Sequence, residues 1–358
     1  MDFLYEYGLF LAKAVTWVAA IVIVLGAIAA NAMKGKGGKK GELELTNLSE
    51  HFAEVKRNIK AELLSKEEFK ALEKAEKEAE KKRAKAAKQA AKKAKDSQDD
   101  SPKESDQKGK IYVVDFKGSM DAHEAESLRE EVSAILAVAN KQDEVVVRLE
   151  SPGGVVHGYG LASSQLARFR QKEIPLTVAV DKVAASGGYM MACVANKILS
   201  APFAIIGSIG VLAQIPNFHR LLKKNNIDFE QLTAGEFKRT LTLFGENTDA
   251  GRDKFKQELE ETHTLFKQHI NDFRPALDID KVATGEHWYG SQAKDLGLID
   301  DVQTSDDYLL EQYETKDVFQ VKYVQKKSLS DKLPIGAAKM ADAIFVKAWQ
   351  RLQSLKQQ

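Results

Sequence analysis

The chain has 358 residues, a formal net charge of +1 and a single cysteine, Cys193. This length is sufficient for two domains and for a large hydrophobic core. The balanced charge excludes binding of nucleic acid through an overall positive charge. One cysteine excludes an intramolecular disulfide and a metal site made of several cysteines. Because Cys193 stands in an apolar stretch, we expect a small buried hydrophobic residue there, and we predict no metal and no cofactor.

Residues 14–33 form an apolar segment without any charge. Twenty residues are enough to cross the hydrocarbon core of a bilayer. The alternative is a cleavable signal peptide, because Ala30-Asn31-Ala32 has the small-x-small pattern of a cleavage site. The residues before the segment include two acidic side chains and one lysine, and so lack the basic start of a signal peptide. We therefore predict a retained N-terminal transmembrane anchor over residues 1–33.

Basic residues follow the predicted anchor directly, at Lys34, Lys36, Lys39 and Lys40. By the positive-inside rule they place the rest of the chain in the cytoplasm. Residues 48–95 have the composition of a helix, and residues 96–109 that of a disordered linker. Together they predict a spacer over residues 34–109.

Within this spacer, residues 73–95 consist only of Ala, Glu, Lys, Arg and Gln, with ten basic and four acidic side chains. Such a segment cannot build a core, which indicates a solvated helix. Contact with anionic lipid headgroups is a second possibility. No aromatic side chains stand between the lysines, which argues against nucleic acid as a partner.

Strands and helices alternate from residue 110 onward. The predicted strands cover residues 111–116 and 144–149 and a segment ending at Asp181, and the predicted helices cover 121–140, 159–171 and a segment after Ser186. This alternation predicts an α/β domain with a mostly parallel sheet and functional loops at the carboxyl ends of its strands. Two glycine-containing loops, Ser151–Gly154 and the loop around Ser186, follow such strands and are expected to form one cleft.

Further along the chain, we predict strands at 198–200 and 228–233 and helices at 217–225, 249–272 and 337–355. The apolar run 189–215 has a second membrane span as its alternative. Asn196, Lys197 and Pro202 interrupt the run, so we expect buried core instead.

Ser186 is the candidate nucleophile of the predicted cleft. Small residues flank it between the end of a strand and a helix start at Gly187 or Gly188. Such a turn exposes a hydroxyl where N–H groups at the helix start face a developing oxyanion. From the local pattern alone, a helix N-cap serine is an equal alternative.

A serine nucleophile needs a base. Three histidines of the domain, His157, His219 and His287, could serve, but none stands in a context that favours this role. The other candidate is Lys238, in a short loop after Phe237, because a lysine can act as a general base once it is buried.

Five motifs occur in order along the chain: Ser151-Pro152-Gly153-Gly154, Ala185-Ser186-Gly187-Gly188-Tyr189, Gly207-Ser208-Ile209-Gly210-Val211, Gly235-Glu236-Phe237-Lys238, and Thr284-Gly285 followed by Ala293 and Leu296-Gly297-Leu298. Over residues 110–302 they resemble the signal peptide peptidase A family of Ser–Lys membrane proteases, most closely its SohB branch. The resemblance implies a crotonase-like, Clp-protease-like α/β fold with an anchored N-terminus.

The resemblance also implies roles for individual residues. Ser186 is the nucleophile and Lys238 its general base, while the backbone N–H groups of Gly154 and Gly187 form the oxyanion hole. Ser208 supports the orientation of the lysine.

The family's assembly and location lead to further expectations. Its long members carry two tandem copies of the domain, and its half-length members form rings whose active sites are completed between neighbouring subunits. One copy here implies a homo-oligomeric ring. The family places the catalytic domain outside the cytoplasm, on a bacterial inner membrane, whereas the lysines after the anchor indicate the cytoplasm, so its side stays open. The predicted layout is an anchor over 1–33, a spacer over 34–109, a peptidase domain over 110–305 and an extension with an amphipathic helix over 306–358.

The predicted function is that of a membrane-anchored serine endopeptidase that cleaves peptides, signal-peptide remnants or unfolded segments. One alternative is an acyl-CoA hydratase or isomerase on the same fold, for which Glu150 is the only obvious catalytic acid. Another is a non-catalytic membrane scaffold.

Overall fold

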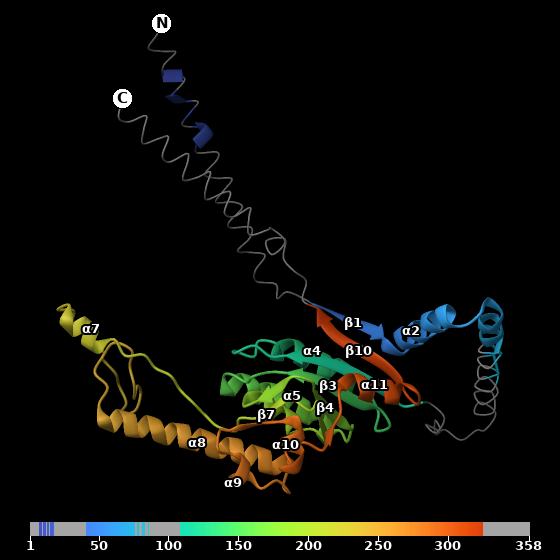
Figure 1. Cartoon of the computed structure of the whole chain (residues 1–358). Helices are drawn as coiled ribbons and strands as arrows, with labels where there is room; N and C mark the ends of the chain where they lie inside the picture. Colours follow the sequence, from blue (N-terminus) through green and yellow to red (C-terminus); the bar gives the residue numbers. More distant parts are fainter. Residues whose placement is uncertain are drawn as a thin grey trace, which may run out of the picture. The chain divides into compact units, whose positions relative to one another are not determined.

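The computed structural model describes residues 41–75 and 108–324, with scattered positions between 7 and 17 and between 77 and 85 (Figure 1). Most of the predicted anchor, the linker at 96–107 and the C-terminal helix at 337–355 lie outside the described residues. Within the described part, no helix is both long and apolar enough to cross a membrane. The chain divides into two compact units, one of them Glu44–Lys322. In the other, Met1–Leu43 with Tyr323–Gln358, the Gly41 N–H donates to the Tyr323 hydroxyl at 2.8 Å.

A seven-stranded sheet organises the larger unit. Its order is β1-β10-β2-β3-β4-β6-β9, and the pairings from β10 through β9 are parallel. The strands are β1 (Glu42–Asn47), β2 (Lys110–Lys117), β3 (Glu144–Glu150), β4 (Leu176–Val180), β6 (Lys197–Ser200), β9 (Asp301–Val302) and β10 (Asp317–Val324). The prediction of an α/β fold with a mostly parallel sheet is confirmed.

Both faces of the large sheet are covered, which explains its nearly continuous apolar strands. Alternate residues of β2 point to opposite faces: Val114 and Phe116 join the main core, and Ile111 and Val113 join a second, smaller core. The main core takes in helices α4 (Ala125–Leu136), α5 (Val156–Gln171), α6 (Gly187–Ala192) and part of α8 (Asp249–Phe273). The second core lies against α2 (Leu48–Leu63) and α11 (Ser305–Tyr313).

A three-stranded sheet lies next to the predicted site. It consists of β5 (Val183–Ala185), β7 (Ile205–Gly207) and β8 (His287–Tyr289), with β5 parallel and β8 antiparallel to β7. Short helices α9 (Ile279–Val282) and α10 (Gly290–Asp295) flank β8. Because β5 follows β4 after only two residues and ends at Ala185, Ser186 lies at the junction of the two sheets and α6.

Two predicted helices are shorter in the structure. The helix expected at 121–140 begins at Ala125, because Ala122 has a positive φ of 53° and the residues before it form a turn. The helix expected at 48–95 breaks at Leu64, whose backbone is extended, and a second helical stretch covers 66–75. The compact unit extends on both sides of the predicted domain 110–305, since α2 and β10 pack with the sheet.

Residues 211–248 form a segment that leaves the sheets and returns to the start of α8; we call it the arm (Figure 1). It contains one short helix, α7 (His219–Lys224). The predicted strand at 228–233 is wrong, because in the described structure these residues have no neighbouring strand to bond. The apolar run predicted to be core is buried from Tyr189 to Ala195, but its end, from Leu212 onward, lies exposed in the arm. Cys193 is buried as predicted, and burial raises the pKa of its thiol.

Candidate active site

Ser186 lies at the turn between β5 and α6 in an unusual backbone conformation, with φ 51° and ψ −117°. Positive φ is costly for a residue with a side chain and is typical of functional turns. Two backbone bonds hold the turn: the Ser186 N–H donates to the Gly207 carbonyl at 2.8 Å, and its carbonyl accepts from the Met190 N–H at 2.9 Å. The Ser186 side chain makes no capping bond to α6 within the described structure. The N-cap alternative therefore does not account for its hydroxyl.

A cavity of about 500 Å3 opens in front of Ser186. Its walls come from the loop after β2, the loop after β3, the turn at Ser186, the loop after β7 and one side of α8. The lining residues are Met120, Pro152, Gly153, Gly154, Val155, Val156, Ser186, Gly187, Met190, Ser208, Gly210, Val211, Leu212, Thr262, Phe266 and Gly285. None of these described residues is Asp, Glu, Lys, Arg or His. The cleft is thus suited to an uncharged, largely apolar segment.

The glycine loop after β3 lies directly against the Ser186 turn. Gly153 has φ 89°, and a Cβ atom there would stand 2.7 Å from the Ala185 carbonyl oxygen and 2.9 Å from the Gly187 nitrogen. A Cβ atom on Gly154 would stand 2.0 Å from the Met120 carbonyl oxygen. Only glycine fits such approaches. The structure therefore brings Gly154 and Gly187 together at one cleft, as the sequence predicted.

Gly187 lines the cleft at the start of α6. Gly187 is the first residue of α6, and the first N–H groups of a helix have no acceptor within the helix. Ser208 also lines the cleft; it has φ 50°, and its N–H donates to the Glu286 carbonyl at 2.7 Å. This holds the loop after β7 beside Ser186.

Lys238 does not lie with Ser186 in the described chain. It is exposed and lines a different cavity, of about 800 Å3, whose described walls all belong to the arm between residues 215 and 244. The three candidate histidines, His157, His219 and His287, do not line the Ser186 cleft either. Within the described residues, a single chain therefore places the predicted nucleophile at the cleft and none of the four candidate bases.

Glu150 does not fit the role of a catalytic acid at this cleft. It lines a separate charged cavity on the other side of β3, where it pairs with Lys182 at 3.0 Å and Lys117 at 3.3 Å. The hydrogen bond from Lys182 and the nearby charge of Lys117 lower the pKa of Glu150. The carboxylate stays ionised and does not line the Ser186 cleft.

Sequence reasoning missed several residues of the cleft. Met120 comes from the loop after β2, and Thr262 and Phe266 come from α8, about 80 residues beyond the nucleophile. It also missed Tyr159, a buried side chain of α5 that contacts the glycine loop through Ser151. The i, i+4 spacing of Thr262 and Phe266 was the one available signal, and it predicts only a shared helix face.

The fold and cleft define an α/β protein with a cleft at the carboxyl ends of its parallel strands, and comparison with known proteins makes the class specific. The model of the N-terminal region of peptidase family S49 matches residues 2–166, and the model of peptidase family S49 itself matches residues 168–319. The chain belongs to this family of peptidases, which includes the signal peptide peptidase A proteins, and to its SohB branch.

Two relatives support this assignment. The chain is 56% identical over 331 residues to a probable protease SohB of Haemophilus influenzae, covering 92% of each chain. It is 50% identical over 310 residues to a probable protease SohB of Buchnera aphidicola subsp. Schlechtendalia chinensis, covering 87% of this chain and 99% of the relative. One solved structure, a mutant of the 1510-N membrane-bound stomatin-specific protease, matches at 15% identity with a TM-score of 0.37, covering 57% of this chain and 85% of that one.

Proposed function

We propose that the chain is a membrane-anchored serine endopeptidase that cleaves peptides, signal-peptide remnants or unfolded segments. Membership in a peptidase family supports the protease activity. The observation that carries the serine mechanism is the placement of Ser186 at a strained strand-to-helix turn, facing an apolar cleft beside the Gly154 and Gly187 N–H groups. In this proposal the Ser186 oxygen attacks the peptide carbonyl, and these two N–H groups stabilise the resulting oxyanion.

The base in this proposal is Lys238 of a neighbouring copy of the chain. Ser186 passes its proton to that lysine, the lysine returns a proton to the leaving amine, and water then releases the acyl group from Ser186. The position of Lys238 in the arm, away from the cleft of its own chain, supports a site completed between subunits. Ser208, in the cleft wall, is proposed to help orient the incoming lysine.

The arm has the surface expected of a segment that another subunit covers. Leu232 is 93% exposed, Leu212 79% and Phe237 54%. Burial of a large apolar side chain stabilises a protein by about 1.5–3 kcal/mol. A subunit that covered these three side chains would therefore stabilise the assembly by several such amounts. A closed homo-oligomeric ring supplies a neighbour for every arm.

The proposal includes features that lie largely outside the described residues. These are the anchor over 1–33 in a bacterial inner membrane, contact of the charged segment 73–95 of the spacer over 34–109 with lipid, and the C-terminal extension over 306–358. For the peptidase domain over 110–305 we propose the crotonase-like, Clp-protease-like variety of α/β fold. No observation favours the acyl-CoA hydratase alternative, since Glu150 is paired with lysines in another cavity.

The test of this function is the Ser186→Ala variant. Removing the nucleophile should lower the cleavage of labelled casein by about 10³-fold or more, because only stabilisation by the oxyanion hole remains. The variant should keep the Tm and oligomeric state of the parent chain. If a folded Ser186→Ala protein kept most of its activity, Ser186 would not be the nucleophile.

A further inference from the structure

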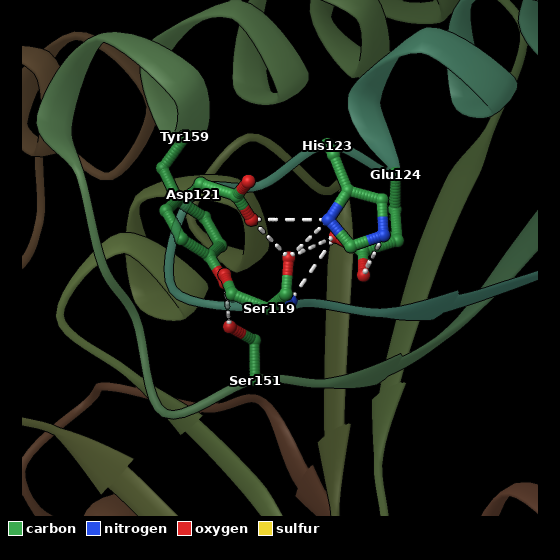
Figure 2. A network of polar contacts seen from close by, with 6 residues as sticks. All are labelled: Ser119, Asp121, His123, Glu124, Ser151 and Tyr159. Carbon is green, nitrogen blue, oxygen red and sulfur yellow. Dashed lines mark hydrogen bonds and ion pairs between the residues drawn. The ribbon is translucent and has the colours of Figure 1, made fainter. Parts of the chain in front are cut away.

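A chain of hydrogen bonds runs beneath the glycine loop of the cleft. Figure 2 shows Tyr159 of α5 reaching Ser151, at the end of β3, and the backbone of Ser119, in the loop after β2. The Tyr159 and Ser151 hydroxyl oxygens are 2.5 Å apart, and the Tyr159 hydroxyl lies 2.8 Å from the Ser119 carbonyl oxygen. The Gly153 N–H donates to the Ser151 hydroxyl oxygen at 3.0 Å. Tyr159 and Ser151 are both fully buried.

Only one arrangement of protons satisfies all of these contacts. A carbonyl can only accept, so the Tyr159 hydroxyl donates to Ser119. The Ser151 hydroxyl must then donate to the Tyr159 oxygen, which leaves the Ser151 oxygen to accept from the Gly153 N–H. Burial raises the pKa of Tyr159 and keeps its hydroxyl protonated. Hydrogen bonds that all point the same way strengthen one another, so this chain is a stiff connection.

The ring of Tyr159 contacts the other half of the predicted oxyanion hole. A Cβ atom on Gly187 would stand 2.4 Å from the Cγ atom of the tyrosine ring, so the ring lies directly against the start of α6. A Cβ atom on Gly118 would stand 2.4 Å from the tyrosine hydroxyl and 2.8 Å from the Ser151 hydroxyl. Both glycines leave space that Tyr159 fills. One side chain thus touches the loop after β2, the loop after β3 and the nucleophile turn.

The loop after β2 is itself held by further hydrogen bonds. The Ser119 hydroxyl lies within 2.8 Å of Asp121, His123 and Glu124 (Figure 2). At the cleft, the Met120 carbonyl accepts from the Val155 N–H at 2.8 Å. A shift of Tyr159 would therefore move Met120 and the Gly153–Val155 segment together.

We propose that Tyr159 is a positioning residue for the reaction at Ser186. Its hydroxyl fixes the Gly153–Gly154 loop through Ser151, and its ring supports Gly187, so the two N–H groups of the oxyanion hole keep a set separation. This role rests on the proposed function, because it concerns the same reaction. Tyr159 does not touch the substrate and exchanges no proton with it.

The Tyr159→Phe variant tests the role, since it removes the hydroxyl and keeps the ring. We expect kcat for a fluorogenic peptide to fall about 10-fold, part of the loss that follows removal of a whole oxyanion-hole donor. KM should stay within about twofold, because the oxyanion contact is made in the transition state and not with bound substrate. Ser151→Ala should have a similar effect, and the double variant should lose no more than the larger single loss, since both break one chain of bonds.

Tyr308→Phe is the matched control. The Tyr308 hydroxyl is also buried and lies 2.5 Å from a Glu144 carboxylate oxygen, but it belongs to the second core, on the other face of the sheet. This variant should lower Tm and leave kcat within about twofold of the parent. Full-length protein in detergent is used throughout. If Tyr159→Phe kept the parent kcat, or if Tyr308→Phe lowered kcat as much as Tyr159→Phe does, the positioning role would be wrong.

A second measurement separates this inference from the proposed function. If the parent chain cleaves nothing, or Ser186→Ala remains active, the function fails and kinetics no longer report on Tyr159. Amide hydrogen exchange of residues 150–156 then decides. The hydrogen bonds predict that Tyr159→Phe speeds this exchange about 10-fold, while Tyr308→Phe leaves it unchanged. Equal exchange in the parent and Tyr159→Phe would overturn the role whatever the activity.

Discussion

The Ser186 cleft and the arm differ in how closely their residues are packed within one chain. Around the cleft, the glycine loop, the Ser186 turn and α6 are packed closely enough that Gly153, Gly154 and Gly187 have no space for a Cβ atom. In the arm, large side chains such as Leu232 and Phe237 are exposed; Phe218, Phe229 and Phe244 contact one another, and the Lys254 ammonium lies 5.2 Å from the centre of the Phe237 ring. One region carries the predicted nucleophile and the other the predicted base. In the proposed function, the region around Ser186 is complete within one chain, whereas the arm supplies its lysine to a neighbouring subunit.

The largest expected effect of a change in the arm is at Lys238. Lys238→Arg keeps the positive charge and much of the length, but a guanidinium stays protonated and cannot accept a proton from Ser186. Casein cleavage should fall by about 10³-fold, with no change in Tm, because Lys238 is exposed in the single chain. An active Lys238→Arg protein, together with an inactive His157→Ala protein, would assign the base to a histidine instead.

The smallest expected effect concerns the loop after β2, on the cleft side of the comparison. Hydrogen bonding to Asp121 and the nearby charge of Glu124 raise the pKa of His123, and the bond from His123 lowers the pKa of Asp121 to about 2. A histidine whose pKa rises on folding stabilises the folded state at pH values below its unfolded pKa of about 6.5. This stabilisation is lost as the pH rises through the raised pKa of the folded state.

The test compares the Tm of the parent and His123→Gln between pH 5 and pH 9. These groups are exposed, so the parent should exceed the variant by at most about 2 °C at the acid end and by nothing at the alkaline end. The opposite trend, with the difference growing toward alkaline pH, would show that the protonated histidine does not stabilise the loop.

Much of the fold follows from local sequence patterns. The strands at 144–150 and 176–180 are short, β-branched runs between helices, and such alternation leads to a parallel sheet. That sheet predicts Gly154 and Ser186 at one edge, where the structure has them. The pairing of β10 with β2 joins residues about 200 positions apart, and no local pattern shows it. The strand expected at 228–233 has the local composition of a strand, but a strand also requires a neighbour to bond.

The candidate site was less predictable than the fold. The positions of Gly154, Ser186 and Gly187 just after predicted strands indicate that they lie together, because the ends of parallel strands meet at one edge of the sheet. The sequence offered Lys238 as one of four candidate bases, and only the resemblance selected it; its pairing with Ser186 stays a prediction. Tyr159 could not be found, because a tyrosine in a helix gives no sign of which hydroxyl or carbonyl it will reach. Its role depends on three loops that meet only in the folded chain.

Mixing two inactive variants tests most directly whether the site is shared between subunits. Ser186→Ala keeps the lysine and Lys238→Ala keeps the serine, so each alone should be inactive. If the lysine comes from a neighbour, an equal mixture of co-assembled subunits should regain about one quarter of the parent activity, since half of the sites have the serine and half of those face an intact arm. A mixture of parent subunits with the Ser186→Ala, Lys238→Ala double variant should show the same quarter. No recovery in the first mixture, with half of the activity kept in the second, would show that serine and lysine act within one chain.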